Sequence, residues 1–439
     1  MMTRQDANSD AREEFAPRIS SPDRSRIDPT PKRIDELIPP DHKARLVWAL
    51  VEGLDMTELY EEIKSVEGHA GRPAIDPRIL VALWLYATDE SIASAHELAR
   101  RCIDCDPYKW ICGGVHVNYH TLADFRVQHP QWLGQQVVAQ IAALRAEGLV
   151  NLDKLGQDGM RVRANAGNDS FKKAEKLSQL LDEAEQQWDR LQDEFDETQQ
   201  SSPRERAAAE RAARERIERI KQAQEEVKQV AEQREKRKKG DGKTARASTT
   251  DPEARRMKMG DGGTRPAYNV QFDTELDSLV IVGVDVVQAG SDSGQIEPMV
   301  QQIEADQGPL PEDGEYYVDG GFASNADLES LGQRGVTVFA PVKAVEKKKQ
   351  KGQDPYAPKR GDTPHVASWR QRMGSAEAQE KYKQRSKTEF PNATCRNRGL
   401  QQFLVRGLAK VKTVVLWYVL IHNLFRMVAL RAGRAIQAA

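Results

Sequence analysis

The chain has 439 residues, 30% of them charged, and its formal net charge is -2. This length suggests two or three domains, each long enough to bury a core. The polar start, M-M-T-R-Q-D-A-N-S-D, lacks the apolar segment of a secretory signal, and the apolar run 414–421 is too short to span a bilayer. We therefore expect a soluble, cytoplasmic protein whose 4 cysteines stay reduced.

Positive charge is concentrated toward the C-terminus. Residues 343–434 hold 21 Lys and Arg against 6 Asp and Glu, so this part carries +15 and the rest of the chain -17. Such an asymmetry favours a polyanionic partner, with nucleic acid as the first candidate. A solvated surface beside acidic helices would show the same balance, so charge alone leaves both interpretations open.

Residues 1–40 are rich in Arg, Asp, Ser and Pro without periodicity, which predicts a flexible arm. Residues 41–150 have a helical pattern, and we expect an all-α N-terminal domain there. A buried helix should begin within G-R-P-A-I-D-P-R-I-L, with Asp76 as its N-cap and Pro77 in its first turn.

Two short predicted helices follow, S-I-A-S-A-H-E-L-A-R-R and N-Y-H-T-L-A-D-F-R, joined by a polar connector. The second should be capped by Asn118. The pair resembles a helix-turn-helix, which makes four residues candidate DNA contacts: Tyr119, His120, Thr121 and Arg126. An ordinary helical subdomain has the same pattern, so both interpretations stand.

The same region has a loosely zinc-like spacing, C-x2-C-x6-C-x3-H, formed by Cys102, Cys105, Cys112 and His116. The cysteine pairs lie close together for a zinc finger. Packing of small buried side chains is therefore the favoured interpretation, and zinc the minor one.

The character of the sequence changes after Gly148. The stretch L-G-Q-D-G-M-R-V-R-A predicts two strands with a turn at Asp158-Gly159. Residues 171–240 are charged and almost free of glycine, with two apolar seams at helical spacing and the turn signal T-Q-Q-S-S-P-R between them. This predicts an antiparallel, coiled-coil-like helical hairpin inserted into the domain.

Strand signals return after the insertion. A-Y-N-V-Q-F-D and S-L-V-I-V-G-V-D-V-V flank the turn T-E-L-D and predict a β-hairpin. A helix near residues 294–306, the strands E-Y-Y-V-D and V-T-V-F-A-P-V, a basic loop and further helices follow. This alternation predicts an α/β domain with a mixed sheet over residues 151–434.

Three acidic residues stand out in this domain. Asp158 and Asp319 are expected at the ends of strands, and Glu389 on a late helix. Each alone could be a turn residue or a helix cap. Together, three carboxylates from separate elements suit Mg²⁺ or Mn²⁺, which support phosphodiester chemistry, while the surrounding Lys and Arg would hold phosphates.

The last of these acids belongs to Y-K-Q-R-S-K-T-E-F, whose spacing places Tyr382, Arg385 and Glu389 on one face of a helix. Pro391 is expected to kink or end this helix soon after the glutamate, so Arg396 need not share that face.

With Arg396, these residues match the signature Tyr-x2-Arg-x3-Glu-x6-Lys/Arg of a large group of bacterial insertion-sequence DDE transposases, which the chain resembles. Further matching segments are G-R-P-A-I-D-P-R-I-L, A-Y-N-V-Q, S-D-S-G-Q-I-E-P-M and F-L-V-R-G-L-A-K-V-K. The resemblance covers about residues 41–431, counted over the matched segments.

The resemblance implies an RNase H-like catalytic domain, with two acids on neighbouring strands and the glutamate on a later helix. It makes Asp158, Asp319 and Glu389 the catalytic metal ligands for Mg²⁺ or Mn²⁺. It also implies double-stranded DNA partners, namely terminal inverted repeats and target DNA, with cleavage of the element ends followed by strand transfer. A homodimer is expected in the synaptic complex.

The resemblance further implies that Tyr382 and Arg385 contact DNA near the scissile site and that Arg396 continues the phosphate contacts. The expected location is the bacterial cytoplasm, on the nucleoid when the protein is bound to DNA, with no membrane partner. Two alternatives remain open: a catalytically inactive, transposase-derived DNA-binding protein, and an RNase H-like nuclease without strand transfer.

Overall fold

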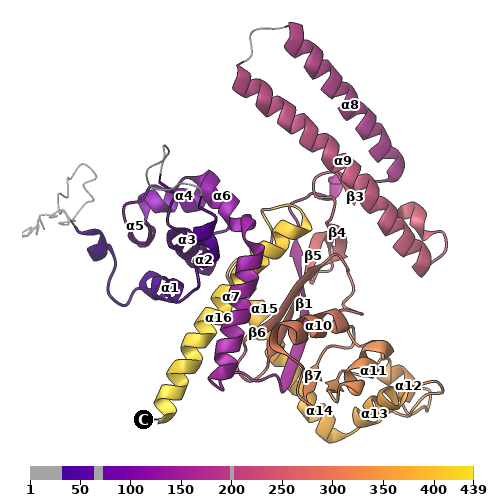
Figure 1. The fold of residues 1–439 in the computed structure, drawn as a ribbon. Helices are drawn as coiled ribbons and strands as arrows, with labels where there is room; N and C mark the ends of the chain where they lie inside the picture. Colours follow the sequence, from indigo (N-terminus) through magenta and orange to yellow (C-terminus); the bar gives the residue numbers. More distant parts are fainter. Residues whose placement is uncertain (1–31, 64–72, 198–201, 439) are drawn as a thin grey trace, which may run out of the picture.

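The computed structural model describes residues 32–63, 73–197 and 202–438. A six-stranded mixed sheet lies at its centre, preceded in the chain by a helical region and carrying a two-helix projection at one end (Figure 1). These features confirm the predicted mixed α/β protein with a helical N-terminal region. Most of the predicted flexible arm falls outside the described residues.

The N-terminal region consists of short helices around one buried helix, α3. In chain order they are η1 (Ile34–Leu37), α1 (Lys43–Glu52), α2 (Thr57–Glu61), α3 (Pro77–Asp89), α4 (Ala95–Asp104), α5 (Asp106–Cys112), α6 (Tyr119–Gln128) and α7 (Pro130–Ala146). Helix α3 begins as predicted, because the Asp76 carboxylate accepts a hydrogen bond from Arg78 N at 2.9 Å and Pro77 is the first helical residue.

The predicted helix-turn-helix has three helices. α4 and α6 correspond to the two expected helices, and Asn118 caps α6 by accepting a hydrogen bond from Thr121 N at 3.0 Å. The expected connector contains α5, which ends at the left-handed Gly113. With only 7 residues, α5 is too short to show a periodic pattern in the sequence.

The sheet has the strand order β6-β5-β1-β7-β8, and β4 pairs with another part of β5. Its strands are β1 (Lys154–Arg163), β4 (Arg255–Lys258), β5 (Thr264–Glu275), β6 (Ile281–Val287), β7 (Glu315–Tyr317) and β8 (Thr337–Phe339). β1, β7 and β8 run parallel, whereas β5 is antiparallel to β1 and β6. The predicted β5–β6 hairpin is therefore confirmed. Helix α10 (Ile296–Gln307) precedes β7, and α11 (Asn325–Gln333) precedes β8.

The first strand differs from the prediction. Residues 154–163 form one continuous strand, β1, without a turn at Asp158-Gly159. Glycine serves close packing here, because a Cβ at position 159 would lie 2.4 Å from Asp292 Oδ1 and 2.6 Å from Gln271 Nε2. An Asp-Gly pair is a local turn signal, and pairing with β5 overrides it.

The chain leaves the sheet between β1 and β4 to form the predicted helical hairpin. Helices α8 (Ala174–Glu197) and α9 (Pro203–Arg237) pack together, flanked by η2 (Asn168–Ser170), β2 (Phe171–Lys172), η3 (Asp241–Thr244) and β3 (Ala247–Ser248). A separate apolar cluster holds the base of the hairpin: Leu177, Ala223, Val227, Val230, Ala245 and Ala247. Residues 198–201 of the predicted turn lie outside the described residues.

The C-terminal part is helical, as predicted. Its elements are α12 (Val345–Lys349), α13 (Pro364–Arg372), α14 (Ala376–Tyr382), η4 (Lys383–Thr388), α15 (Glu389–Asn397) and α16 (Leu408–Ala438). Figure 1 shows α16 running alongside α7 across the molecule, and these two helices are in contact.

Among the described residues, α16 is the one helix long and apolar enough to cross a membrane, whereas the apolar run 414–421 alone predicts a segment too short to do so. In the fold, 67% of its most apolar window is buried. Asn423 completes the outer edge of β6, because its side chain accepts from Ile281 N at 3.0 Å and donates to Ile281 O at 2.9 Å. Core packing accounts for the composition of this helix.

Candidate active site

Asp158 lies beside an open part of the sheet edge. In the described structure β7 pairs with residues 154–156 of β1 and ends before it reaches Asp158. Alternation along β1 directs the Asp158 side chain toward the face where α15 packs, and this side chain is 17% exposed. A carboxylate placed where a neighbouring strand stops is open to a ligand on one side.

Three donors hold the Asp158 carboxylate. Arg385 Nη2 lies 3.1 Å from Oδ1, Gly159 N donates to the same oxygen at 2.9 Å, and Asn392 Nδ2 donates to Oδ2 at 2.9 Å. Burial raises the pKa of Asp158, and the charge of Asp319 adds to this effect. The three donors lower the pKa but do not cancel the cost of burial.

Arg385 connects two of the three predicted acids. Its Nη1 lies 3.3 Å from Glu389 Oε1, while its Nη2 contacts Asp158. The Arg385 side chain is 21% exposed, whereas that of Glu389 is 66% exposed. A guanidinium cation therefore lies between one half-buried and one solvent-exposed carboxylate.

Asp319 follows β7 by two residues, and its Oδ1 accepts a hydrogen bond from Gly321 N at 2.6 Å. Burial raises the pKa of Tyr382, and the charges of Asp319 and Asp158 raise it further against the opposing effect of Arg385. Asp319 thus acts electrostatically on both Asp158 and Tyr382. Parallel pairing of β7 with β1 brings it there.

The signature residues do not share one regular α-helix, contrary to the prediction. Tyr382 ends α14, Arg385 lies in η4, and Glu389 begins α15. The tighter winding of η4 changes the angular spacing between them. Arg385 Nη1 nevertheless lies 3.3 Å from Glu389 Oε1, so these two side chains lie on the same side without the predicted single helix.

Pro391 does not end the last helix of the signature, because α15 begins at Glu389 and continues to Asn397. It lies in the first turn of α15, where backbone N–H groups have no intrahelical acceptor, so its missing donor costs nothing. Arg396 follows Glu389 by seven residues on the same helix, a spacing that returns to the same face. The exposed side chain of Arg396 therefore lies on the Glu389 side of α15.

Gly156 allows η4 to pack closely on β1. A Cβ at this position would lie 2.5 Å from Thr388 Cγ2 and 2.9 Å from Leu276 Cδ2. Thr388 is buried and stands between Arg385 and Asn392 in the sequence. Close approach at Gly156 therefore brings both donors to Asp158.

Within the described ranges, no group of three or more His, Cys, Asp or Glu side chains is close enough to hold a metal ion. The three predicted ligands are not brought to that distance in this structure, in which Arg385 separates Asp158 from Glu389. The donor chemistry fits a divalent cation all the same. Asp158 and Glu389 offer carboxylate oxygens, and the buried Asn392 Oδ1 has no hydrogen-bond partner among the described residues.

The predicted DNA contacts of the N-terminal region have different environments. Tyr119 is 36% exposed at the start of α6, and its ring stacks on His96 with centroids 3.8 Å apart. His120 is exposed and lies against the same tyrosine ring. These two side chains are placed where a DNA contact is possible.

Arg126 is buried, whereas the predicted DNA contact requires an exposed side chain. It is 5% exposed, its guanidinium carbon lies 4.5 Å from the centroid of the Trp84 ring, and it donates to Ala93 O. Burial lowers the pKa of Arg126, although Tyr418 opposes this. The side chain holds helices together and is not accessible to DNA, which corrects the prediction.

Packing explains the cysteines of this region. Cys102, Cys105 and Cys112 are free thiols, and Cys112 is buried. Neither they nor His116 belong to a metal-binding group within the described ranges. The zinc interpretation therefore receives no support.

Two features of the site were missed in the sequence. Asn392 reaches Asp158, and its position three residues after Glu389 on α15 was the available signal. The second is a polar cluster on the opposite face of the sheet. There Asp292 accepts hydrogen bonds from Arg161 Nη2 at 2.8 Å, Asn269 Nδ2 at 2.7 Å and Gln271 Nε2 at 2.9 Å.

Comparison with known families gives two matches. Residues 32–128 match the family described as Transposase domain (DUF772), and residues 240–424 match the family described as Transposase DDE domain. The second match includes Asp319, Arg385 and Glu389, whereas Asp158 on β1 lies outside both. No curated protein matches the chain. Taken together, the two matches support an insertion-sequence DDE transposase as the family of this chain.

Proposed function

We propose that this protein is a transposase of the signature group named above. It binds the terminal inverted repeats of an insertion sequence, cuts DNA at the element ends and joins the freed ends to target DNA. The observation that carries the proposal is the contact of Asp158 with Arg385 and of Arg385 with Glu389, at an open sheet edge near Asp319. Asp158 lies on β1 and Asp319 follows the paired strand β7 by two residues, which supports an RNase H-like domain.

Asp158, Asp319 and Glu389 would hold Mg²⁺ or Mn²⁺ in this proposal. When bound, such a cation would favour ionisation of the attacking water or hydroxyl and stabilise negative charge on the phosphodiester. The half-buried Asp158 is fixed by its three donors, whereas the exposed Glu389 is free to change rotamer. Arg385 balances the two carboxylates and can turn its guanidinium toward a DNA phosphate.

The remaining roles concern DNA binding. Tyr382 stands half-buried beside the acids, where its hydroxyl can contact DNA near the scissile phosphate. Arg396 would extend the phosphate contacts along α15, and Tyr119 with His120 would contact DNA from α6. Joining two element ends calls for a homodimer in the synaptic complex, and we expect the protein in the cytoplasm, on the nucleoid when DNA-bound.

One alternative is favoured by a specific observation. Because the acids are not gathered into a metal-binding group among the described residues, the chain could be a transposase-derived protein that binds DNA without cutting it. A nuclease without strand transfer is the other candidate.

The test uses DNA that carries the inverted repeats flanking the gene, incubated with the protein and Mg²⁺ or Mn²⁺. We expect cleavage and joining by the wild type. Asp158→Asn, Asp319→Asn and Glu389→Gln should each lower cleavage by about 1,000-fold or more while DNA binding stays within about twofold. Asp153→Asn, which changes an exposed acid just before β1, should cut normally.

Cleavage without joining would favour the nuclease, and binding without cleavage the inactive protein. Normal cutting by any one of the three acid variants would remove that residue from the proposed metal site.

A further inference from the structure

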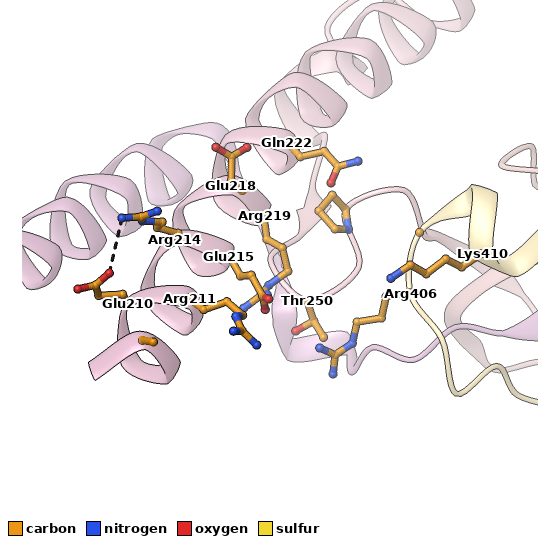
Figure 2. A pocket seen from close by; sticks show the side chains of 13 residues that line it. Glu210, Arg211, Arg214, Glu215, Glu218, Arg219, Gln222, Thr250, Arg406 and Lys410 are labelled. Atoms are coloured by element: carbon orange, nitrogen blue, oxygen red, sulfur yellow. Dashed lines mark ion pairs between the residues drawn. The ribbon is translucent and has the colours of Figure 1, made fainter. Parts of the chain in front are cut away.

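A groove of about 670 Å³ lies between α9 and the chain that leads into α16 (Figure 2). One wall is formed by α9 between Ala207 and Gln222, and the other includes Thr250, Arg406 and Lys410. Figure 2 shows Arg211 and Arg219 extending from α9 toward Thr250 and Arg406, with Lys410 approaching from the start of α16. None of the proposed catalytic residues lines this groove, which we call the α9–α16 groove.

Basic side chains outnumber acidic ones in the α9–α16 groove. Its lining contains the basic residues Arg211, Arg214, Arg219, Arg406 and Lys410 and the acidic residues Glu210, Glu215 and Glu218. Glu210 lies 3.7 Å from Arg214, and Glu215 lies 3.6 Å from Arg219. By contrast, Arg211 and Lys410 are exposed and form no ion pair in the described part of the chain. Unpaired cations thus face the groove from both walls, and one acid without an ion pair among the described residues, Glu218, lies on α9 beside them.

The α9–α16 groove continues the strand edge that carries Asp158. Beyond β7 this edge is joined by the chain after α15, because Arg163 bridges to Gln402, and Arg406 Nε donates to Asn165 O at 3.3 Å. Asn165 follows Asp158 by seven positions, the first five of them in β1, a span of roughly 20 Å. This corresponds to about six base pairs of duplex DNA.

A second basic groove, of about 730 Å³, lies farther along α9 and is lined by Arg234, Arg246, Arg256, Lys258 and residues 288–291. No acidic residue lines it. However, Ala289 O and Gly290 O accept hydrogen bonds from Asn269 and Arg161, whose side chains point to the sheet face opposite Asp158. This groove lies behind the sheet, and its exposed cations provide a matched comparison.

We propose that the α9–α16 groove binds the phosphate backbone of duplex DNA about six base pairs from the cleavage site. The helical hairpin then forms one side of the DNA-binding groove. Arg211 on the hairpin and Lys410 at the start of α16 contact phosphates from opposite sides. This inference rests on the proposed function, because the distance is counted from the proposed catalytic acids. It assigns a DNA-binding role to the inserted hairpin.

The experiment measures binding of the full chain to a mixed-sequence duplex of about 40 base pairs, without divalent metal, between about 50 and 200 mM salt. The variant Arg211→Gln/Lys410→Gln removes two cations while keeping good helix formers. Loss of two phosphate contacts should lower the slope of log affinity against log salt by about 2, so that the loss of affinity over this salt range shrinks about tenfold. The control Arg256→Gln/Lys258→Gln removes the same charge from the second groove and should leave the slope within about 0.5 of the wild type.

An unchanged slope for Arg211→Gln/Lys410→Gln, or an equal drop in the control, would overturn the proposal. Circular dichroism of both variants excludes a folding defect as the cause. The readout needs no cleavage, so it separates the two proposals. If the variant changes the slope but the protein cuts no DNA, the proposed transposase function is rejected and DNA binding by the groove is retained. If the protein cuts DNA normally but the slope is unchanged, only DNA binding by the groove is rejected.

Discussion

The orientation of the Asp158 carboxylate is fixed by hydrogen-bond donors from its own strand and from the segment around α15. Burial raises its pKa, yet Arg385, Gly159 and Asn392 each stabilise the ionised form. Asn392 is the least replaceable of these, because its amide donates to Oδ2 at 2.9 Å while its own oxygen stays unpaired among the described residues. The Asn392 side chain thus uses its amide donor on Asp158 and leaves its oxygen without a partner among the described residues. This arrangement suits a residue that orients a carboxylate proposed to bind metal.

Asn392→Ala should therefore impair activity more than folding. We expect a 10- to 100-fold fall, approximately, in cleavage rate and a higher divalent-ion concentration for half-maximal activity, because the carboxylate loses its orienting donor. The measurement is cleavage across a titration of Mg²⁺ or Mn²⁺. Asn397→Ala, at the exposed end of the same helix, serves as the control. Equal metal dependence of Asn392→Ala and wild type would contradict the role.

Asp273 illustrates a buried acid outside the proposed metal site. It is buried on β5, where Tyr316 donates its hydroxyl to Asp273 Oδ2, and burial raises the pKa of Asp273 to about 7. In the unfolded chain the carboxyl ionises near 3.8. The protonated form is thus favoured in the fold, and the stability that it contributes is lost as pH rises through about 7.

We expect this group alone to reduce the free energy of unfolding by roughly 2 to 3 kcal/mol between about pH 5 and pH 8. Asp273→Asn, which cannot ionise, should flatten that part of the pH profile. The measurement is urea unfolding at several pH values. Asp124→Asn, an exposed change on α6, should keep the wild-type profile. A steep loss of stability that persists in Asp273→Asn would rule out this group as its source.

At the scale of elements, the segment from α14 to α15 shows how tertiary packing interrupts a helix that the sequence signature predicts. Its spacing predicts one helix, but η4 interrupts it where Thr388 is buried against β1. Gly156 makes this contact possible, because any side chain there would overlap Thr388 and Leu276. The site therefore depends on how closely one element approaches another.

Gly156→Ala should destabilise the protein by roughly 1 to 3 kcal/mol and reduce cleavage, because the added methyl forces η4 away from β1. Thr388→Ser removes the methyl that would clash at 2.5 Å while keeping the hydroxyl. In the double variant we expect part of the stability and activity to return, measured by thermal unfolding and cleavage. If the double variant is as impaired as Gly156→Ala alone, the contact with Thr388 is not the cause.

At the scale of the whole molecule, the N-terminal helices and the sheet share one hydrophobic core that includes α3, α7 and α16. Polar contacts reinforce the junction: Trp417 Nε1 donates to Arg126 O at 2.9 Å, and Arg398 Nε lies 2.8 Å from Asp89 Oδ1. The sequence suggested a boundary near residue 150, and the proposed domains on either side are joined by a continuous buried interface.

We therefore expect the N-terminal region and the sheet to unfold together in one thermal transition. Calorimetry and tryptophan fluorescence should report the same midpoint, because Trp84, Trp132 and Trp417 are all buried around this junction. Arg398→Met, which breaks the pair with Asp89, should lower that midpoint without splitting the transition. A separate, earlier transition of the N-terminal helices would show that the two regions are independent.

The sequence by itself determined the features that depend on near neighbours in the chain. The caps at Asp76 and Asn118, the β5–β6 hairpin and the α8–α9 hairpin all follow from local spacing and residue type, and the structure confirms them. The motifs also indicated the transposase resemblance, which the two family matches support. The role of the three acids stays a prediction.

Only the tertiary structure decided which face and which partner each side chain meets. Gly159 lies inside a strand because β1 pairs with β5, and the residue is a glycine because Asp292 and Gln271 occupy the space where a Cβ would be. Arg126 is buried because α3 and the chain before α4 enclose it, although its charge suggested a surface contact. Asn392 reaches Asp158 only through the packing of α15 on β1. Strand register and close packing bring together residues that are far apart in the chain. A local sequence pattern does not specify which of these distant residues will be in contact.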